Sequence, residues 1–174
     1  MKYLILALAL LITACTSLLP HPVGATNMAS ADAEGVISTD ALLKQYPAFA
    51  AEYARYQPDA IAIEQMQSLQ GLQGLQGLQG LQLVVLFGTW CHDSEREVPR
   101  LLKLLQQANI ATDNLQLQAV NRQKQHPQQL HSRYNLKYTP TIIVLQNGKE
   151  LGRIIERPQQ SLAEDLAKIA KGSE

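Results

Sequence analysis

The stretch Phe87-Gly88-Thr89-Trp90-Cys91-His92-Asp93-Ser94 decides the fold. It follows a continuous apolar run at residues 83–87, which predicts a buried strand. It leads into residues 94–107, where apolar side chains recur at helical spacing and predict an amphipathic helix. Cys91 therefore lies where a strand ends and a helix begins. The free N–H groups and the positive dipole end of that helix favour a thiolate over a thiol, and the thiolate is the nucleophile.

The neighbours of Cys91 act on its sulfur in different directions. Trp90 can shield one side of the sulfur, and a protonated His92 would stabilise the thiolate. Asp93 opposes this effect, because a nearby carboxylate disfavours a second negative charge.

The chain downstream alternates between strand and helix patterns. Residues 115–120 and 141–145 predict strands, and the Asn147-Gly148 turn predicts a hairpin whose second strand covers residues 150–155. Residues 128–134 predict a short helix and residues 161–170 a closing amphipathic helix. The order β-α-β-α-β-β-α predicts an α/β sandwich with a mixed sheet.

Three motifs in this region resemble the thioredoxin superfamily. They are Trp90-Cys91 after the strand, Pro99 eight residues after the cysteine, and Tyr138-Thr139-Pro140-Thr141 before a strand and an Asn-Gly hairpin. The resemblance covers about residues 81–171 and implies a thioredoxin-like three-layer sandwich. It also implies that Pro140 is a cis-proline beside the redox cysteine. By the same resemblance, Trp90, His92, Thr139 and Pro140 are expected to contact the substrate.

Two positions depart from the thioredoxin pattern. Ser94 stands where the family has its second cysteine, and Val85 stands where it has a buried acid. Cys91 therefore has no resolving cysteine in its motif. We expect monothiol exchange, in which Cys91 attacks a protein or small-molecule disulfide and an external reducing thiol resolves the mixed disulfide. Cys91 and Ser94 are the predicted catalytic pair, with the Ser94 hydroxyl donating a hydrogen bond to the thiolate.

Two other functions fit the same residues. One is a non-catalytic thioredoxin-fold binding or chaperone module, which would hold extended clients beside Pro140. The other is an oxidative sensor in which Cys91 forms a sulfenic acid.

The N-terminus predicts a bacterial lipoprotein. Lys2 precedes an apolar run at residues 3–12, which is too short to span a bilayer and is typical of a secretory signal. Ala14-Cys15 after that run resembles a lipobox, which implies a signal peptide at residues 1–14 and a lipid anchor on Cys15. By resemblance to Gram-negative lipoproteins, the absence of Asp at the next position, where Thr16 stands, implies the outer membrane, facing the periplasm. The alternative is a plain signal peptide cut near residues 23–25.

Four segments follow the signal peptide. Residues 15–38 predict a flexible tether, and residues 39–69 a helical extension whose first helix begins after Thr39 or Asp40 and is kinked or split at Pro47. The Leu-Gln-Gly repeat at residues 70–80 predicts a surface loop. Residues 81–174 form the thioredoxin-like domain.

Composition excludes several classes of protein. The 174 residues carry 15 basic and 15 acidic side chains, and this balance argues against a nucleic-acid binder, which needs a basic face to neutralise phosphates. Two cysteines exclude a disulfide-stapled mini-protein and a multi-cysteine zinc site. His126 and His131 together with Cys91 and His92 suggest a metal site as an alternative, but their spacing matches no metal motif, and we expect solvated histidines. We expect no metal and no cofactor.

Overall fold

The structure is a computed structural model that describes residues 31–72 and 81–172. The predictions for the signal peptide, for Cys15 and for repeat residues 73–80 lie outside the described residues. Among the residues that are described, no helix is both long and apolar enough to cross a bilayer.

The helices and strands expected from the periodicity are present, with shifted ends, and one short strand, β1, was not expected. In chain order the elements are β1 (Gly35–Val36), α1 (Thr39–Gln45), α2 (Pro47–Arg55), α3 (Ala60–Leu72), β2 (Leu81–Phe87), α4 (His92–Gln107), β3 (Leu115–Ala119), α5 (Leu130–Arg133), β4 (Thr141–Gln146), β5 (Lys149–Ile155) and α6 (Leu162–Lys171).

The strands form one five-stranded mixed sheet in the order β1-β3-β2-β4-β5. β2 is parallel to β3, whereas β1 pairs with β3, β4 with β2 and β5 with β4 in antiparallel orientation. β2 lies in the middle of the sheet, which explains why its sequence is a continuous apolar run. This is the α/β architecture with a mixed sheet that the sequence predicts.

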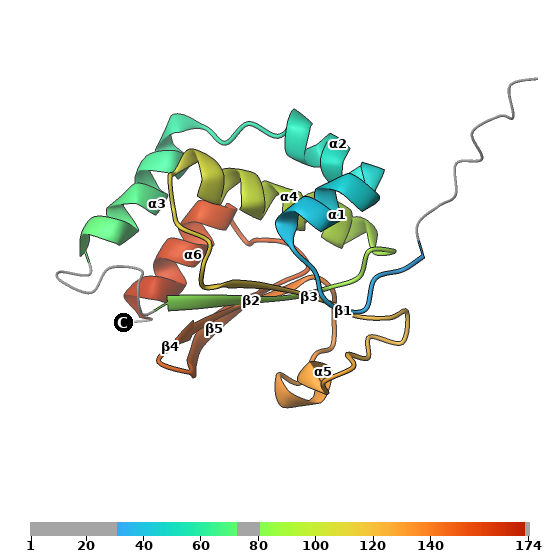
Figure 1. Cartoon of the computed structure of the whole chain (residues 1–174). Coiled ribbons are helices and arrows are strands. Elements are labelled where there is room, and N and C mark those ends of the chain that lie inside the picture. Colours follow the sequence, from blue (N-terminus) through green and yellow to red (C-terminus); the bar gives the residue numbers. More distant parts are fainter. Residues whose placement is uncertain (1–30, 73–80, 173–174) are drawn as a thin grey trace, which may run out of the picture.

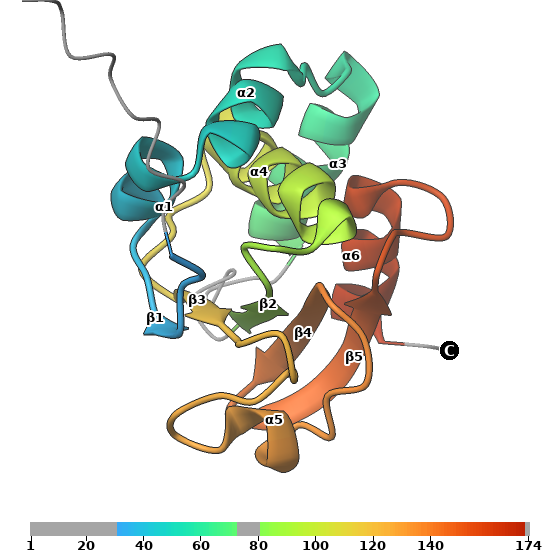
Figure 2. The same cartoon turned by 90° about the vertical axis from the view of Figure 1, so that its right-hand side faces the viewer.

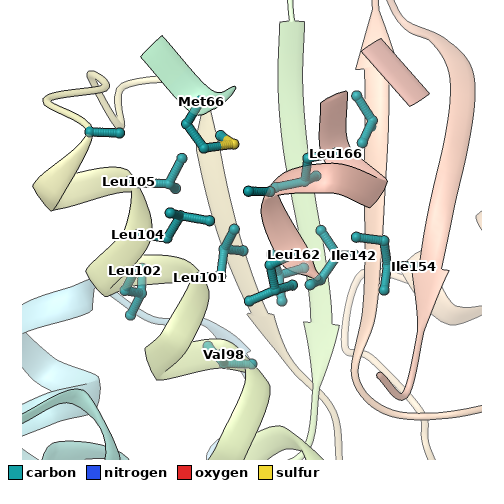
Figure 3. Close-up of a cluster of buried hydrophobic side chains, with 14 of the residues drawn as sticks. Met66, Val98, Leu101, Leu102, Leu104, Leu105, Ile142, Ile154, Leu162 and Leu166 are labelled. Carbon is teal, nitrogen blue, oxygen red and sulfur yellow. The ribbon is translucent and has the colours of Figure 1, made fainter. Parts of the chain in front are cut away.

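The two faces of the sheet carry coverings of unequal size (Figure 1). Alternate residues of β2 point to opposite faces, so Val85 and Phe87 join one apolar cluster while Val84 and Leu86 join another. The first cluster is filled by α4, α6 and the N-terminal helices, and Figure 3 shows its leucines and isoleucines meeting between α4, α6 and the strands. The second cluster is covered by the short α5 and the chain around it, which Figure 2 shows below the sheet. The third layer of the sandwich is therefore thin.

The N-terminal extension packs onto the domain instead of standing apart from it. Pro47 splits the first predicted helix and begins α2, because proline fits the first helical position and lacks the N–H that a continuing helix needs. α2 lies along α4, where Phe49 packs edge-on against Phe87 with ring centroids 5.8 Å apart. α3 lies against α6.

Three predictions in this region are wrong in detail. The predicted tether at residues 15–38 includes β1 at its end, where Gly35 pairs with Ala119 because β3 offers a free edge. The first helix is capped by Ser38, whose Oγ accepts a hydrogen bond from the N–H of Ala41, and not by Thr39 or Asp40. α3 continues to Leu72, past the predicted end at residue 69, since buried Met66 and Leu69 hold its last turns on the core.

Candidate functional site

Cys91 is the N-cap residue of α4. Its backbone is extended (φ −100°, ψ 122°), and its carbonyl accepts the first helical hydrogen bond from the N–H of Glu95 at 2.9 Å. A tight turn connects it to β2, closed by the hydrogen bond from the Cys91 N–H to the carbonyl of Gly88 at 3.1 Å. The half-buried thiol is therefore held at the positive end of a long helix, as the sequence predicts.

The partner of the Cys91 sulfur comes from a distant part of the chain. Sγ lies 3.1 Å from the carbonyl oxygen of Thr139, 48 positions along the sequence. The Thr139–Pro140 peptide bond is cis, as predicted for Pro140. Both residues are buried and lead into β4, next to β2 in the sheet. In this arrangement the thiol donates a hydrogen bond to the carbonyl, so the geometry is that of the protonated sulfur.

Ser94 does not contact Cys91. Its side chain is fully buried, and Oγ accepts a hydrogen bond from the N–H of Gly88 at 3.3 Å. The predicted Ser94–Cys91 hydrogen bond is not formed, because the Ser94 hydroxyl accepts from Gly88 and the Cys91 thiol instead faces the Thr139 carbonyl. Ser94 instead ties the first turn of α4 to the end of β2.

Trp90 forms a rim of the site. Its Nε1–H donates to the carbonyl of Val120 at 3.1 Å, and the Arg122 guanidinium lies 6.0 Å from the ring centroid. The indole lies so close over Gly88 that a Cβ there would come within 2.5 Å of the ring. The absence of a side chain at position 88 therefore leaves the space that the Trp90 ring occupies.

The charged groups of the first helical turn are paired. The exposed His92 side chain lies with Nδ1 3.0 Å from Oε2 of Glu95. Asp93 pairs with Arg96 at 2.6 Å and with Arg157 at 3.6 Å. Two cations therefore offset the Asp93 charge. From the sequence alone, this charge was expected to disfavour a thiolate on Cys91.

Sequence reasoning missed several residues around the site. The N–H of Glu156, a residue with φ of 60°, donates to the carbonyl of Pro140 at 2.8 Å. Arg157 follows it and reaches Asp93, so one turn after β5 supports both halves of the site. Glu97 is buried against Arg96, and its Oε2 has no hydrogen-bond partner among the described residues. No local pattern marks these residues, because their contacts join segments that are distant in the sequence.

The prediction of solvated histidines is wrong for His126. Its side chain is 2% exposed, and its Nε2 lies 3.0 Å from Oε1 of Gln118, a buried residue of β3. His131 is half-buried, and its Nδ1 accepts a hydrogen bond from the His126 N–H. The alternating Leu and Gln residues of β3 could have indicated a buried polar partner such as His126, since a glutamine on a buried strand face needs one. Within residues 31–72 and 81–172, no three His, Cys, Asp or Glu side chains gather in a way that could hold a metal ion.

Comparison with known proteins finds weak similarity to solved structures. No family model and no curated protein matches it. Trxlp from Edwardsiella tarda EIB202 is 21% identical, with 65% of this chain and 94% of that chain covered at a TM-score of 0.39. A protein of unknown function from Pseudomonas aeruginosa is 23% identical, with 78% and 86% covered at a TM-score of 0.36. An HIV epitope-scaffold is 22% identical, with 78% and 89% covered at a TM-score of 0.35. The chain is similar to these structures, but likenesses of this size assign it neither a family nor an activity.

Proposed function

We propose that the protein carries out monothiol thiol–disulfide exchange through Cys91. The observation that carries the proposal is the position of the Cys91 sulfur, which is half-buried at the N-terminus of α4 and 3.1 Å from the Thr139 carbonyl. The helix end stabilises a thiolate when the proton leaves. The segment that contains Thr139 and Pro140 then forms the other wall of the site, where the disulfide of a client is held.

The exchange needs no separate electron acceptor, because each step replaces one sulfur of a disulfide, first of the client disulfide and then of the mixed disulfide. The Cys91 thiolate attacks one sulfur of a client disulfide, so a mixed disulfide forms and the other client sulfur leaves as a thiolate. An external thiolate then attacks the mixed disulfide. It releases Cys91 and keeps the client sulfur in a new disulfide. Ser94 supports this cycle by fixing the start of α4, not by touching the sulfur.

We further propose that the protein works in the bacterial cell envelope, anchored through an acylated Cys15 and facing the periplasm. The apolar run before Ala14-Cys15 supports this proposal. Acylation would leave Cys91 as the one free thiol of the mature chain, since the sequence contains two cysteines. Intact-mass measurement of the full chain purified from a bacterial membrane tests it. A diacylglycerol adduct on Cys15 is expected, and an unmodified or absent Cys15 would contradict it.

The exchange itself is tested with the full chain in detergent and a small aromatic disulfide whose released thiolate is coloured. Wild type is expected to release one equivalent and to carry a mixed disulfide on the peptide that contains Cys91. Addition of a second thiol is expected to restore the free sulfur. Cys91→Ser keeps the volume of the side chain and removes the nucleophile, so it is expected to abolish release.

Two results would count against the proposal. Release that is unchanged in Cys91→Ser would place the reactive sulfur elsewhere. A Cys91 that stays unmodified while both Cys91→Ser and wild type retain the same client proteins would favour the binding module instead. Glu64→Gln, on the exposed side of α3, is the control variant and is expected to retain the release.

A further inference from the structure

The chain between β3 and β4 contains a loop, residues 121–136, in an unfavourable backbone conformation. Lys124 and Gln129 have φ of 60° and Asn135 has φ of 50°. Side chains other than glycine rarely adopt this region, because Cβ approaches the following carbonyl. Backbone hydrogen bonds close the turns of the loop, and Oδ1 of Asn121 accepts the N–H groups of Gln123 and Gln125.

Two imidazole rings accept further backbone N–H groups of the loop. Nδ1 of His126 accepts the N–H of Gln128 at 3.1 Å, and Nδ1 of His131 accepts the N–H of His126 at 2.9 Å. Because Nδ1 of His126 is an acceptor, its proton sits on Nε2 and is donated to Oε1 of Gln118 at 3.0 Å. The neutral ring thus links the loop to the sheet, and a ring protonated on both nitrogens cannot make the bond to Gln128.

Two cations of the same loop lie against the aromatic rim of the Cys91 site. The carbonyl of Val120, which directly precedes the loop, accepts the indole N–H of Trp90. Arg122 lies over the Trp90 ring, and the Lys124 ammonium lies 5.7 Å from the ring centroid of Tyr138. Tyr138 is 51% exposed and adjoins Thr139, whose carbonyl faces the Cys91 sulfur. The loop therefore contacts the rim through Arg122 and Lys124, while Val120 is itself tied to β2 by the hydrogen bond from its N–H to the carbonyl of Phe87 at 2.8 Å.

The other charged groups on the elements around His126 are occupied or exposed. His131 is the neighbour whose charge acts on the ring. Two of the nearby cations form ion pairs, Arg122 with Asp32 and Arg153 with Glu150. Two others lie over aromatic rings, Lys124 over Tyr138 and Arg133 over Tyr134. Glu34, in the segment before β1, is exposed. β3 presents the amides Gln116 and Gln118 on this face. No described carboxylate contacts the ring to stabilise its charged form.

We propose that His126 is an acid-sensitive latch, whose protonation at Nδ1 releases residues 121–136 and with them the Trp90–Tyr138 rim of the Cys91 site. The proton comes from solvent, and the Gln128 N–H loses its acceptor. Burial lowers the pKa of His126, and the charge of His131 lowers it further, so the latch is closed at neutral pH. The inference rests on the proposed function only in treating that rim as part of an exchange site.

Trp90 reports on the latch directly, since it is the one tryptophan of the sequence. The experiment measures Trp90 fluorescence of the full chain in detergent from about pH 8 to about pH 4. One inflection is expected below the ordinary histidine value of about 6.5. Because the signal comes from Trp90 and not from the sulfur, a protein without exchange activity would still give it. Failure of the proposed function and failure of the latch are therefore distinguishable.

Matched histidine variants assign the inflection. His126→Asn keeps an acceptor at the δ position that does not titrate, so the inflection is expected to disappear. His131→Asn removes the neighbouring charge, so the inflection is expected at higher pH. His92→Asn tests the exposed histidine beside Trp90 and is expected to leave the inflection in place.

The wild-type protein provides a second measurement in case His126→Asn does not fold. The ¹⁵N shifts of the His126 ring are expected to show the Nε2–H form at neutral pH. The ring is expected to titrate together with Trp90 fluorescence and with faster exchange of the Gln128 N–H. The proposal is overturned if the inflection survives in His126→Asn or vanishes in His92→Asn. It is equally overturned if the ring titrates while the Gln128 N–H stays protected.

Discussion

The two faces of the sheet are covered by different kinds of interaction. The face under α4 and α6 is covered by hydrocarbon side chains, with Leu101 and Leu104 fully buried among them. The opposite face has a small apolar cluster and depends on the hydrogen bonds of His126 and Gln118. Burial of hydrocarbon is insensitive to pH, whereas a buried imidazole is not. The helix-covered face is therefore expected to determine stability, and the loop-covered face to determine how the site responds to its surroundings.

The largest expected effect is a cavity on the helix-covered face. Leu101→Ala removes a fully buried side chain between α4 and the sheet, so it is expected to lower the free energy of unfolding by about 2–5 kcal/mol. Urea unfolding measures the loss. Ile61→Ala on the exposed side of α3, where the side chain is 68% exposed, is the control and should change the value by less than about 0.5 kcal/mol. Equal losses in the two variants would contradict the packing described for this face.

A smaller effect is expected from overpacking next to the loop-covered face. Gly88→Ala places a Cβ 2.5 Å from the Trp90 ring, which must move and lose its hydrogen bond to Val120. We expect a loss of about 1–3 kcal/mol together with a shift of the Trp90 emission. In Gly152→Ala the new Cβ meets the γ carbons of Ile169 at 3.0 and 3.1 Å, a less severe contact than at Gly88, so a smaller loss and an unchanged Trp90 emission are expected. An unchanged emission in Gly88→Ala would mean that Trp90 is not held where the structure has it.

A third test removes the clamp between the extension and the domain. Glu52 on α2 is largely buried and hydrogen-bonds both Arg55 and Arg100, the latter on α4 at 2.6 Å. Glu52→Gln keeps the shape and removes the charge, so we expect a loss of about 1–2 kcal/mol in urea unfolding. Glu64→Gln on the exposed side of α3 is the matched control and should be neutral. A neutral Glu52→Gln would show that packing alone holds α2 on α4.

The smallest effect is a pH dependence that separates the two faces. The folded-state pKa of His126 lies below 6.5, so between those values the unfolded chain binds a proton that the folded chain does not, and stability falls as the pH falls. Burial raises the pKa of Glu52, but its hydrogen bonds with Arg100 and Arg55 lower it more, to a net value below 4.5. Its contribution is present above pH 4.5 and is lost as the pH falls through the folded pKa.

The measurement is the free energy of unfolding between about pH 8 and about pH 3. His126→Asn is expected to flatten the profile in the upper window and Glu52→Gln in the lower one. A single variant that flattened both windows would contradict the assignment of one group to each face.

Much of the fold was predictable because its elements are encoded locally. The apolar run before Gly88 predicted where β2 ends, the helical spacing after Ser94 predicted the apolar face of α4, and Pro47 marked the division of the first helix. The position of Cys91 at a helix N-terminus followed from those two elements alone. The cis form of Pro140 followed from the resemblance, since no periodicity indicates a peptide isomer.

The parts of the site that were not predictable depend on contacts between distant segments. Spacing placed Ser94 one turn beyond Cys91, but its hydroxyl accepts a hydrogen bond from the N–H of Gly88, at the end of the neighbouring strand. Polar neighbours in the sequence suggested a solvated His126, yet the sheet supplies Gln118 as its partner. Arg157 forms an ion pair with Asp93, and no sequence pattern near either residue predicts this pair.

The sequence by itself determined which segments form strands and helices and that a single thiol begins α4, because hydrophobic period and helix capping act over a few residues. Only the tertiary structure decided what that thiol faces, which charges are neutralised beside it and which histidine is buried. Those outcomes depend on which backbone carbonyls and side chains the sheet brings together, and that arrangement is set by burial of the whole chain, not by any one stretch of it.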